Sequence, residues 1–236
     1  MTYTLGYWKI RGLRTPITLI LEYGNIPYKE EFYELFQDES GNWSRQNWFE
    51  PKKTIPLDFP NLPYLFDPEN DLKITQMSAI INYICNKHKI LLPESGKDYL
   101  VQQAKVDMMV GVTNDFRAGF TAMCYGRDGN KGDVEKYREN VLPGWLEKFE
   151  KYFSENDYCA GPRLTHCDFN LYEILDHHRI VYKNEELLAD NENGKSKYPN
   201  ICSFMKRIDD LDEVKRYKSS ERWFDHPMNN LSAYVK

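Results

Sequence analysis

The sequence predicts two domains, an α/β domain over residues 1–88 and an all-α domain over residues 98–236, joined by a linker at 89–97. Strand-like and helix-like segments alternate in the first domain, whereas no segment beyond the linker has a convincing strand pattern. The linker contains Pro93 and Gly96, residues that interrupt regular structure. A chain of 236 residues, 41% of them hydrophobic, is long enough to form two cores.

The first domain opens with a strand that ends near Tyr7. Its β-branched and aromatic residues are bounded by glycines, as is typical of a strand. A helix is expected from Pro16 to Tyr23, with Thr15 as N-cap, and Pro27 to Glu34 is the expected second strand, which completes a β-α-β unit. Tyr7 should therefore lie at a strand end beside a helix start, where a phenol can donate its O–H to a negatively charged group. The alternative is an ordinary core tyrosine.

The remainder of the first domain predicts a loop, a hairpin and a helix. Residues 35–54 are polar and aromatic, which indicates a long loop with at most a short helix near residues 43–49. Leu62–Phe66 and Leu72–Thr75 are expected to pair as a hairpin, because the residues between them are turn formers. An apolar stripe then predicts a helix over residues 75–88.

The second domain shows helical patterns only. The first helix is expected to bury residues at four-residue spacing, namely Ala104, Met108, Val112, Phe116 and Phe120. Pro143-Gly144 predicts a kink, and Thr165 with Asp168 forms a capping box that opens a central, buried helix. The expected helices cover residues 98–125, ended by a turn at 127–130, then 133–153, 169–181, 198–208 and 212–217.

Composition narrows the classes of function. The net charge is -5, with 31 basic and 36 acidic residues well mixed, so we expect no nucleic-acid or membrane partner and favour a small or neutral one. The sequence has no apolar run of signal-peptide or membrane-spanning length, which predicts a cytoplasmic protein. The cysteines are odd in number and widely spaced, which predicts reduced thiols. They are Cys85, Cys124, Cys159, Cys167 and Cys202.

Pro63 stands inside the first strand of the expected hairpin, where a trans proline would forfeit a ladder hydrogen bond. A cis Leu62-Pro63 peptide would explain its presence. It would turn the main chain of Leu62 outward and offer a small peptide such as glutathione a backbone edge for pairing. A thioredoxin-like fold carries such a proline, but the Cys-x-x-Cys motif of dithiol chemistry is absent. Tyr7 stands instead of these cysteines at the end of the first strand, the reactive end of such a fold.

Four well-separated motifs together resemble one family. They are LGYWKIRGL at residues 5–13, DFPNLPY at 58–64, ITQ at 74–76 and THCDF at 165–169. With them the chain is similar, over nearly its full length, to mu-class glutathione transferases, and some details resemble arthropod members, including those of mites. The resemblance implies a thioredoxin-like N-terminal domain, an all-α C-terminal domain, a cytoplasmic homodimer, and glutathione as co-substrate without a metal.

The implied activity is conjugation of the glutathione thiolate to hydrophobic electrophiles, a detoxification reaction. By the same resemblance Tyr7 is the catalytic residue, whose hydroxyl donates a hydrogen bond to the glutathione sulfur. A thiol with a pKa of about 8.5 is only a few per cent ionised near neutral pH. A preorganised donor favours the thiolate and so raises the reactive fraction.

The resemblance also implies the other residues that contact substrates. Trp48 and Lys52, with Arg45, would hold the glycine end of glutathione. Gln76 would hold the γ-glutamyl end, joined across the dimer by Asp115. The glutathione site implied by the resemblance also includes Trp8, Leu13, Asn61, Leu62, Pro63 and Met77. The electrophile site would contain Trp8, Leu13, Tyr125 and Asn229.

The sequence departs from the family pattern at three places. Met77 stands where the family usually has a serine, which removes one hydroxyl from the expected site. Asn82 stands where an arginine often lies at the dimer interface. Residues 190–197 resemble an insertion and are expected to form a solvated loop.

Two other classes of function are possible. A non-catalytic binder of glutathione or hydrophobic ligands could share the fold, although Tyr7 favours chemistry. A metal protein could use His166, His177 and His178, but adjacent helix positions diverge by about 100° and ligand-like spacing is missing. We therefore expect solvated helix histidines and no metal site.

Overall fold

The computed structural model describes residues 2–126, 133–183, 196–225 and 227–235. Their contacts divide the chain into two compact units. The first contains residues 1–88 together with Arg216–Tyr234, which we call the C-terminal return, and the second contains Lys89–Lys215. The sequence-based division assigned the return to the second domain, whereas its contacts are with the first unit.

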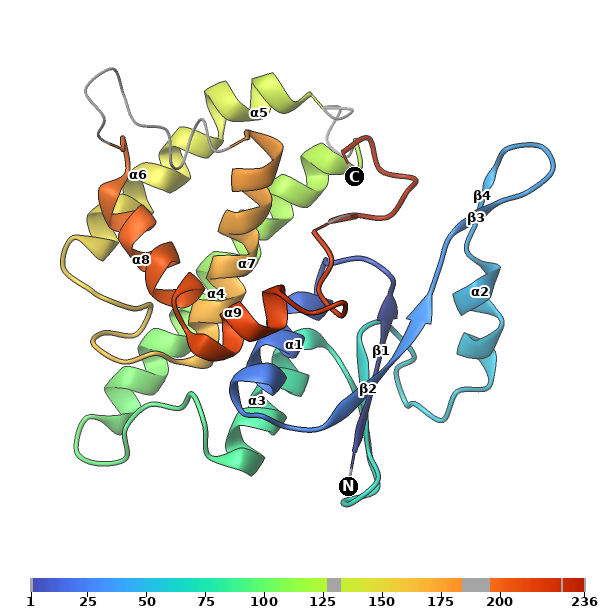
Figure 1. The fold of residues 1–236 in the computed structure, drawn as a ribbon, viewed down its shortest axis with the longest axis horizontal. Coiled ribbons are helices and arrows are strands. Elements are labelled where there is room, and N and C mark those ends of the chain that lie inside the picture. The colour runs from blue at the N-terminus through green and yellow to red at the C-terminus, as the bar shows by residue number, and fades with distance from the viewer. Residues whose placement is uncertain (1, 127–132, 184–195, 226, 236) are drawn as a thin grey trace. The chain divides into compact units, whose positions relative to one another are not determined.

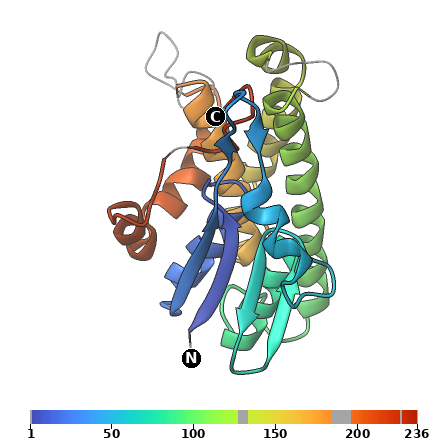
Figure 2. The ribbon, with the colours of Figure 1, turned by 90° about the vertical axis from the view of Figure 1, so that its right-hand side faces the viewer.

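The first unit is built on a mixed four-stranded sheet of order β2-β1-β5-β6. The central strand β1 runs parallel to β2 and antiparallel to β5. It is buried along nearly its whole length, whereas in β2 only Tyr28, Glu30 and Tyr33 are partly buried, as expected for an edge strand. Figure 2 shows the β5-β6 hairpin beside β1. The elements are β1 (Tyr3–Trp8), α1 (Arg14–Tyr23), β2 (Tyr28–Tyr33), β5 (Tyr64–Asp67), β6 (Leu72–Thr75) and α3 (Met77–His88) (Figure 1).

These elements confirm the β-α-β unit and the hairpin, with two differences. Helix α1 begins at Arg14, and Thr15 is not its N-cap, because its hydroxyl bonds back to Arg11 O at 3.4 Å from within the helix. The Leu62-Pro63 peptide is cis, as predicted, but Pro63 precedes β5 and does not lie within it.

The expected long loop contains a short helix within residues 43–49, where the sequence allowed one, and two short strands and a 3-10 turn that the sequence did not reveal. They are β3 (Phe36–Gln37), β4 (Trp43–Ser44), α2 (Gln46–Phe49) and the 3-10 turn η1 (Pro51–Lys53). Strands β3 and β4 are only two residues long, so no alternation can be seen in the sequence. A side-chain turn stabilises their connection, because Asp38 Oδ1 accepts the backbone N–H of Ser40 and of Asn42, each at 2.9 Å.

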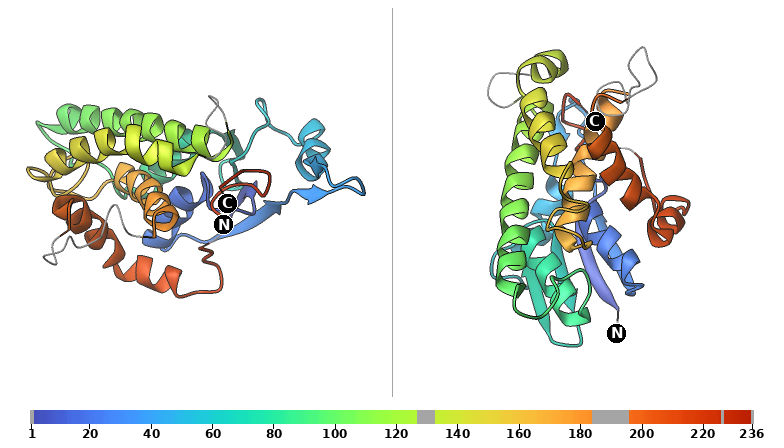
Figure 3. Two further views of the ribbon diagram at one scale, coloured as in Figure 1. Left: turned by 90° about the horizontal axis from the view of Figure 1, so that it is seen from above. Right: turned by 90° about the vertical axis from the view of Figure 1, so that its left-hand side faces the viewer.

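The described part of the second unit contains helices and no strand. The helices are α4 (Tyr99–Cys124), α5 (Val134–Asn140), α6 (Leu142–Phe153), α7 (His166–Val181) and α8 (Pro199–Asp209), and α9 (Asp212–Lys218) leads into the return. Figure 3 shows them as a bundle in which α4 and α7 are neighbours. None of the described helices is long and apolar enough to cross a membrane. The turn at 127–130 and most of the 190–197 segment lie outside the described residues.

The second unit contains one more helix break than predicted, whereas the capping box predicted at the start of α7 is present. The single helix expected over 133–153 is two helices, separated at Val141, with Pro143 in the first turn of α6, where proline is well tolerated. The capping box is confirmed, since the backbone N–H of Thr165 donates to Asp168 Oδ2 at 2.7 Å.

The stripe predicted for the long helix is only half right. Ala104 and Met108 are exposed, because the N-terminal half of α4 buries Val106 and Met109 instead. Farther along, Phe116 is buried as expected, and so is Phe120.

The prediction of solvated histidines is wrong, because α7 lies in the core of the second unit. His166, His177 and His178 are at most 3% exposed. The Nδ1 of His178 bonds Ile174 O at 2.7 Å, and its ring stacks on Phe116 at 4.5 Å. Burial lowers the pKa of His178 to about 3, so the ring is neutral near pH 7. The prediction of reduced cysteines agrees with the structure, in which none of the five cysteines forms a disulfide.

Candidate active site

Tyr7 lies near the end of β1, opposite Phe32 of β2, and is 7% exposed. Its hydroxyl oxygen accepts the backbone N–H of Leu13 across 3.1 Å. This bond comes from the turn between β1 and α1. The sequence predicted the position of Tyr7 at a strand end beside a helix start, but not this bond. An accepted hydrogen bond polarises the phenol and makes its O–H a better donor.

Gly12 allows this turn to approach the Tyr7 side chain closely. Its φ is +41°, in the left-handed region, where residues other than glycine are strained. A Cβ at this position would lie 2.8 Å from the Tyr7 hydroxyl oxygen and 3.0 Å from its ring. The turn therefore requires glycine, both for its backbone conformation and for the space beside the phenol.

A buried apolar cluster surrounds Tyr7 and contains several predicted site residues. Trp48 of α2 is 2% exposed and stacks on Tyr64, with the ring centroids 6.3 Å apart. It also meets Tyr33 edge to face at 5.0 Å. The structure thereby brings together five predicted residues from separate parts of the chain, namely Tyr7, Trp8, Leu13, Trp48 and Leu62.

Two further predicted residues flank Trp48 on the same short segment. The carbonyl of Arg45 accepts the backbone N–H of Trp48 at 3.0 Å, while its side chain is exposed. Lys52 is half-buried in η1, one turn farther along. Both cations therefore lie close in sequence to the buried indole.

The cis peptide lies at the edge of the cluster. Leu62 is 8% exposed, Pro63 is buried, and Asn61 beside them is exposed. Tyr64, the next residue, is the first of β5 and pairs with Gly6 of the neighbouring strand β1. A Cβ at Gly6 would lie 2.1 Å from the Tyr64 ring, so packing requires a glycine in β1 as well as in the turn that follows it.

Gln76 occupies the turn between β6 and α3 with a φ of +75°, which is unusual for a residue other than glycine. Backbone of this kind costs about 1–3 kcal/mol and often marks functional positions. The Gln76 side chain is exposed, Met77 is 7% exposed and Ser78 is exposed. The chain thus presents Gln76 and Ser78 to solvent and directs Met77 inward.

Three remaining predicted residues lie outside the cluster around Tyr7. Asp115 is exposed on α4, and Tyr125 is half-buried where α4 ends. Both belong to the second unit, so their approach to the Tyr7 cluster stays a prediction. Asn229 lies in the return and is 7% exposed. Next to it is a pocket of about 140 Å³, lined in part by Ile10 and Asn230.

Comparison with known proteins identifies the family. Residues 3–86 match the domain family described as "Glutathione S-transferase, N-terminal domain". Residues 114–221 match the family described as "Glutathione S-transferase, C-terminal domain". The chain is 36% identical to Glutathione S-transferase Mu 3 of Macaca fuscata fuscata, over 97% of this chain and 93% of that protein. The chain belongs to the glutathione S-transferase family. Membership makes it a transferase whose co-substrate is glutathione.

This glutathione S-transferase has a further relative that is named for the mu class. The chain is 36% identical to the class-mu 26 kDa isozyme 51 of Fasciola hepatica, over 99% of this chain and 95% of that protein. The pi-class glutathione S-transferase of Onchocerca volvulus superposes with a TM-score of 0.76 at 25% identity, covering 99% and 100% of the two chains. The mu-class resemblance is thereby confirmed, whereas the arthropod resemblance stays a prediction.

Two features of the site were not recognised from sequence. Gly12 was part of a family motif, but nothing in the local sequence shows that a side chain at this position would collide with the Tyr7 hydroxyl. Tyr33 and Tyr64 pack on Trp48, and the hydroxyl oxygens of these two tyrosines lie 3.0 Å apart. Only the position of Tyr64 directly after the cis proline gave a signal for its role.

Proposed function

We propose that this glutathione S-transferase conjugates the thiolate of glutathione to hydrophobic electrophiles and acts as a cytoplasmic homodimer in detoxification. The observation that carries the proposal is the Tyr7 hydroxyl, held by the Leu13 amide beside a cluster of predicted substrate-binding residues. Five cysteines without a disulfide between them support a reducing compartment such as the cytoplasm.

In the proposed mechanism Tyr7 donates its O–H to the glutathione sulfur. The thiol proton leaves to solvent, and the bound thiolate attacks the electrophilic carbon. A C–S bond forms as the leaving group departs with its electron pair, or as a π bond opens in an addition. Each unit by which the donor lowers the thiol pKa corresponds to about 1.4 kcal/mol of preference for the thiolate. A donor fixed in advance supplies such stabilisation without reorganisation.

The other residues would bind glutathione along its length. The main chain of Leu62, next to the cis peptide, would pair with the cysteinyl portion. The side chains of Trp48 and Lys52, with Arg45, would hold the glycine carboxylate. Gln76, whose strained backbone supports a functional role, would contact the γ-glutamyl end.

The second unit would complete the active site. Asp115, reaching across the dimer, would pair with the ligand ammonium, and Tyr125 would face the electrophile. Trp8 and Leu13, which belong to the Tyr7 cluster, would form the apolar wall, with Asn229 near the opening.

Phe59 supports the proposed homodimer. It is 79% exposed, although it is a large apolar ring on the loop before the cis proline. Aromatic residues are enriched among the residues that carry the binding energy of protein interfaces, and such a ring fills a pocket of the partner protein. Insertion into the helical unit of a second copy would bury the ring.

The direct test is a steady-state assay with glutathione and a generic aryl halide, combined with retention on immobilised glutathione. The proposal predicts both turnover and retention. The comparisons give no support to the non-catalytic alternative. Retention without turnover of several classes of electrophile would nevertheless favour that alternative and contradict the proposal.

A further inference from the structure

The turn that holds the Tyr7 hydroxyl is itself held by the C-terminal return. Three successive amides of this turn have three separate acceptors, two carbonyls of the return and the phenol. The pairs are Arg11 N–H to Pro227 O at 2.9 Å, Gly12 N–H to Met228 O at 3.1 Å and Leu13 N–H to Tyr7 Oη at 3.1 Å. Because the amides are consecutive, a displacement of the return would move the amide that contacts the phenol.

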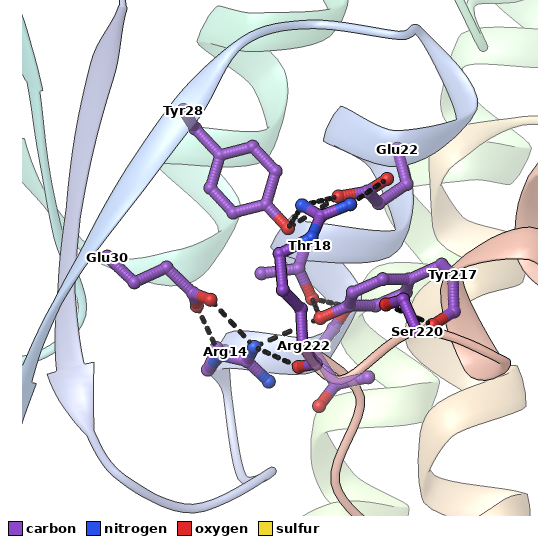
Figure 4. A network of polar contacts seen from close by, with 9 residues as sticks. Arg14, Thr18, Glu22, Tyr28, Glu30, Tyr217, Ser220 and Arg222 are labelled. Carbon is purple, nitrogen blue, oxygen red and sulfur yellow. Dashed lines mark hydrogen bonds and ion pairs between the residues drawn. The ribbon is translucent and has the colours of Figure 1, made fainter.

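Arg14 attaches the return to the sheet and to α1. Its guanidinium is 1% exposed and forms a two-point ion pair with Glu30 of β2. The Nη2 of Arg14 also donates to Tyr217 Oη at 3.0 Å and to the Arg222 carbonyl at 3.3 Å. Tyr217 in turn donates to Thr18 Oγ1 at 3.1 Å (Figure 4). One buried cation thus connects a strand, a helix and the return.

A second anchor lies closer to the surface. The guanidinium of Arg222 pairs with both carboxylate oxygens of Glu22, with Nη2 to Oε2 at 3.0 Å. Tyr28 donates to the same carboxylate at 2.7 Å (Figure 4). Two cation–π contacts add to the attachment, Arg11 over Trp223 at 4.7 Å and Arg14 over Phe224 at 4.1 Å. The return is therefore fixed immediately before the two carbonyls that bind the turn.

We infer that Arg14, Tyr217 and Arg222 are positioning residues for the conjugation reaction. By fixing the return they fix the turn at residues 11–13, and through this turn the direction of the Tyr7 hydroxyl. The inference rests on the proposed function of Tyr7. A hydrogen-bond donor stabilises developing charge only if it is already in place, so a loosened turn weakens the preference for the thiolate. Glutathione binding, which depends on other residues, persists.

The test uses Tyr217→Phe and Arg222→Met. The first removes one hydroxyl and keeps the ring, and the second removes a guanidinium whose side chain is 53% exposed, so the fold is preserved. The matched control is Tyr83→Phe, which removes a hydroxyl bonded to Asp67 and Asn70 in the same unit, away from the return. The absorbance of the bound glutathione thiolate is titrated against pH, and glutathione affinity is measured at acidic pH, where the thiol is protonated.

We expect both variants to raise the apparent pKa of the bound thiol by about half a unit, which lowers the ratio of thiolate to thiol about threefold at a given pH. Affinity for glutathione at acidic pH stays within about twofold, and the control titrates like the wild type. Amide hydrogen exchange at Arg11 and Gly12 becomes faster in both variants, because their acceptors are on the return.

Unchanged titration in both variants would overturn the inference. An equal shift in Tyr83→Phe would also overturn it, since the effect would then be general loosening. Tyr7→Phe distinguishes a failure of the positioning role from a failure of the proposed role of Tyr7. If Tyr7→Phe shifts the titration and the network variants do not, only the positioning role fails. If Tyr7→Phe causes no shift, the proposed role of Tyr7 itself fails.

Discussion

Gly12 leaves no room for a side chain beside the Tyr7 hydroxyl, since a Cβ added at residue 12 would lie 2.8 Å from the phenol oxygen. The neighbouring amide of Leu13 donates to the same oxygen at 3.1 Å. The orientation of the proposed catalytic donor is thus set by main-chain atoms of one turn. Main-chain atoms have fewer alternative positions than side chains, which suits a preorganised donor.

Gly12→Ala is expected to displace the phenol. The apparent pKa of the bound thiol should rise, and kcat should fall about tenfold, less than the about 10²–10³-fold cost of losing such a donor altogether. The control is Gly41→Ala, because Gly41 also has a positive φ, of +80°, but nothing lies within 4 Å of its added Cβ. Equal kcat values for the two variants would show that the contact with Tyr7 is unimportant.

Met77→Ser tests the departure at the γ-glutamyl end. A serine hydroxyl could donate to the ligand carboxylate, and such a bond is worth about 1.5–3 kcal/mol. We expect KM for glutathione to fall by up to about tenfold with kcat little changed, because this contact is far from the sulfur. Met77 is 7% exposed, so its loss should also lower thermal stability.

Ser78→Ala is the control for this change, since the Ser78 side chain is exposed beside Gln76. It should alter KM little. A sharp increase in KM for Ser78→Ala, without any effect of Met77→Ser, would mean that the ligand hydroxyl contact lies one residue farther along the chain.

Phe59→Ala should weaken the proposed dimer. Truncation of a buried anchor ring typically costs about 2 kcal/mol or more of association energy. Analytical ultracentrifugation at micromolar concentration and below should then detect monomer. Phe36→Ala, which removes another exposed ring, serves as control and should sediment like the wild type. A Phe59→Ala protein that stays fully dimeric would exclude the anchor role.

His178 should make stability depend on pH. Burial lowers its folded-state pKa to about 3, so between this value and about 6.5 the unfolded chain binds a proton that the folded protein does not. Stability is therefore fully present above about pH 6.5 and is lost as the pH falls. From pH 7.5 to pH 5 this residue should account for about 2 kcal/mol.

Urea unfolding of the wild type and His178→Gln at both pH values measures this loss. The glutamine variant should be less stable at pH 7.5, because it loses the stacking on Phe116, and its stability should change less with pH. An identical pH dependence in the two proteins would contradict a neutral, buried His178.

Features set by local sequence could be predicted. The capping box of Thr165 depends on four consecutive residues, and the cis peptide before Pro63 depends on a strand proline in a recognisable motif. The burial of His178 could not be predicted, because it results from packing of α7 against aromatic residues of other helices. Its polar side chain gave the opposite indication.

The candidate site shows the same division. Tyr7 and Trp48 were found because each lies in, or next to, a motif of the family, and the fold then brings them into one cluster. The pairing of Arg14 with Tyr217 joins residues 203 positions apart in the chain. No composition or periodicity signals such a contact, so the role of the return became visible only in three dimensions.

The central claim is that the Tyr7 hydroxyl stabilises the bound thiolate. The most direct measurement is the thiolate absorbance of the glutathione complex, titrated against pH for wild type and Tyr7→Phe. Tyr7→Phe is expected to raise the apparent pKa of the bound thiol toward the value of about 8.5 of a free thiol, with glutathione affinity nearly intact and turnover lowered near neutral pH. Superimposable titration curves for the two proteins would contradict the claim.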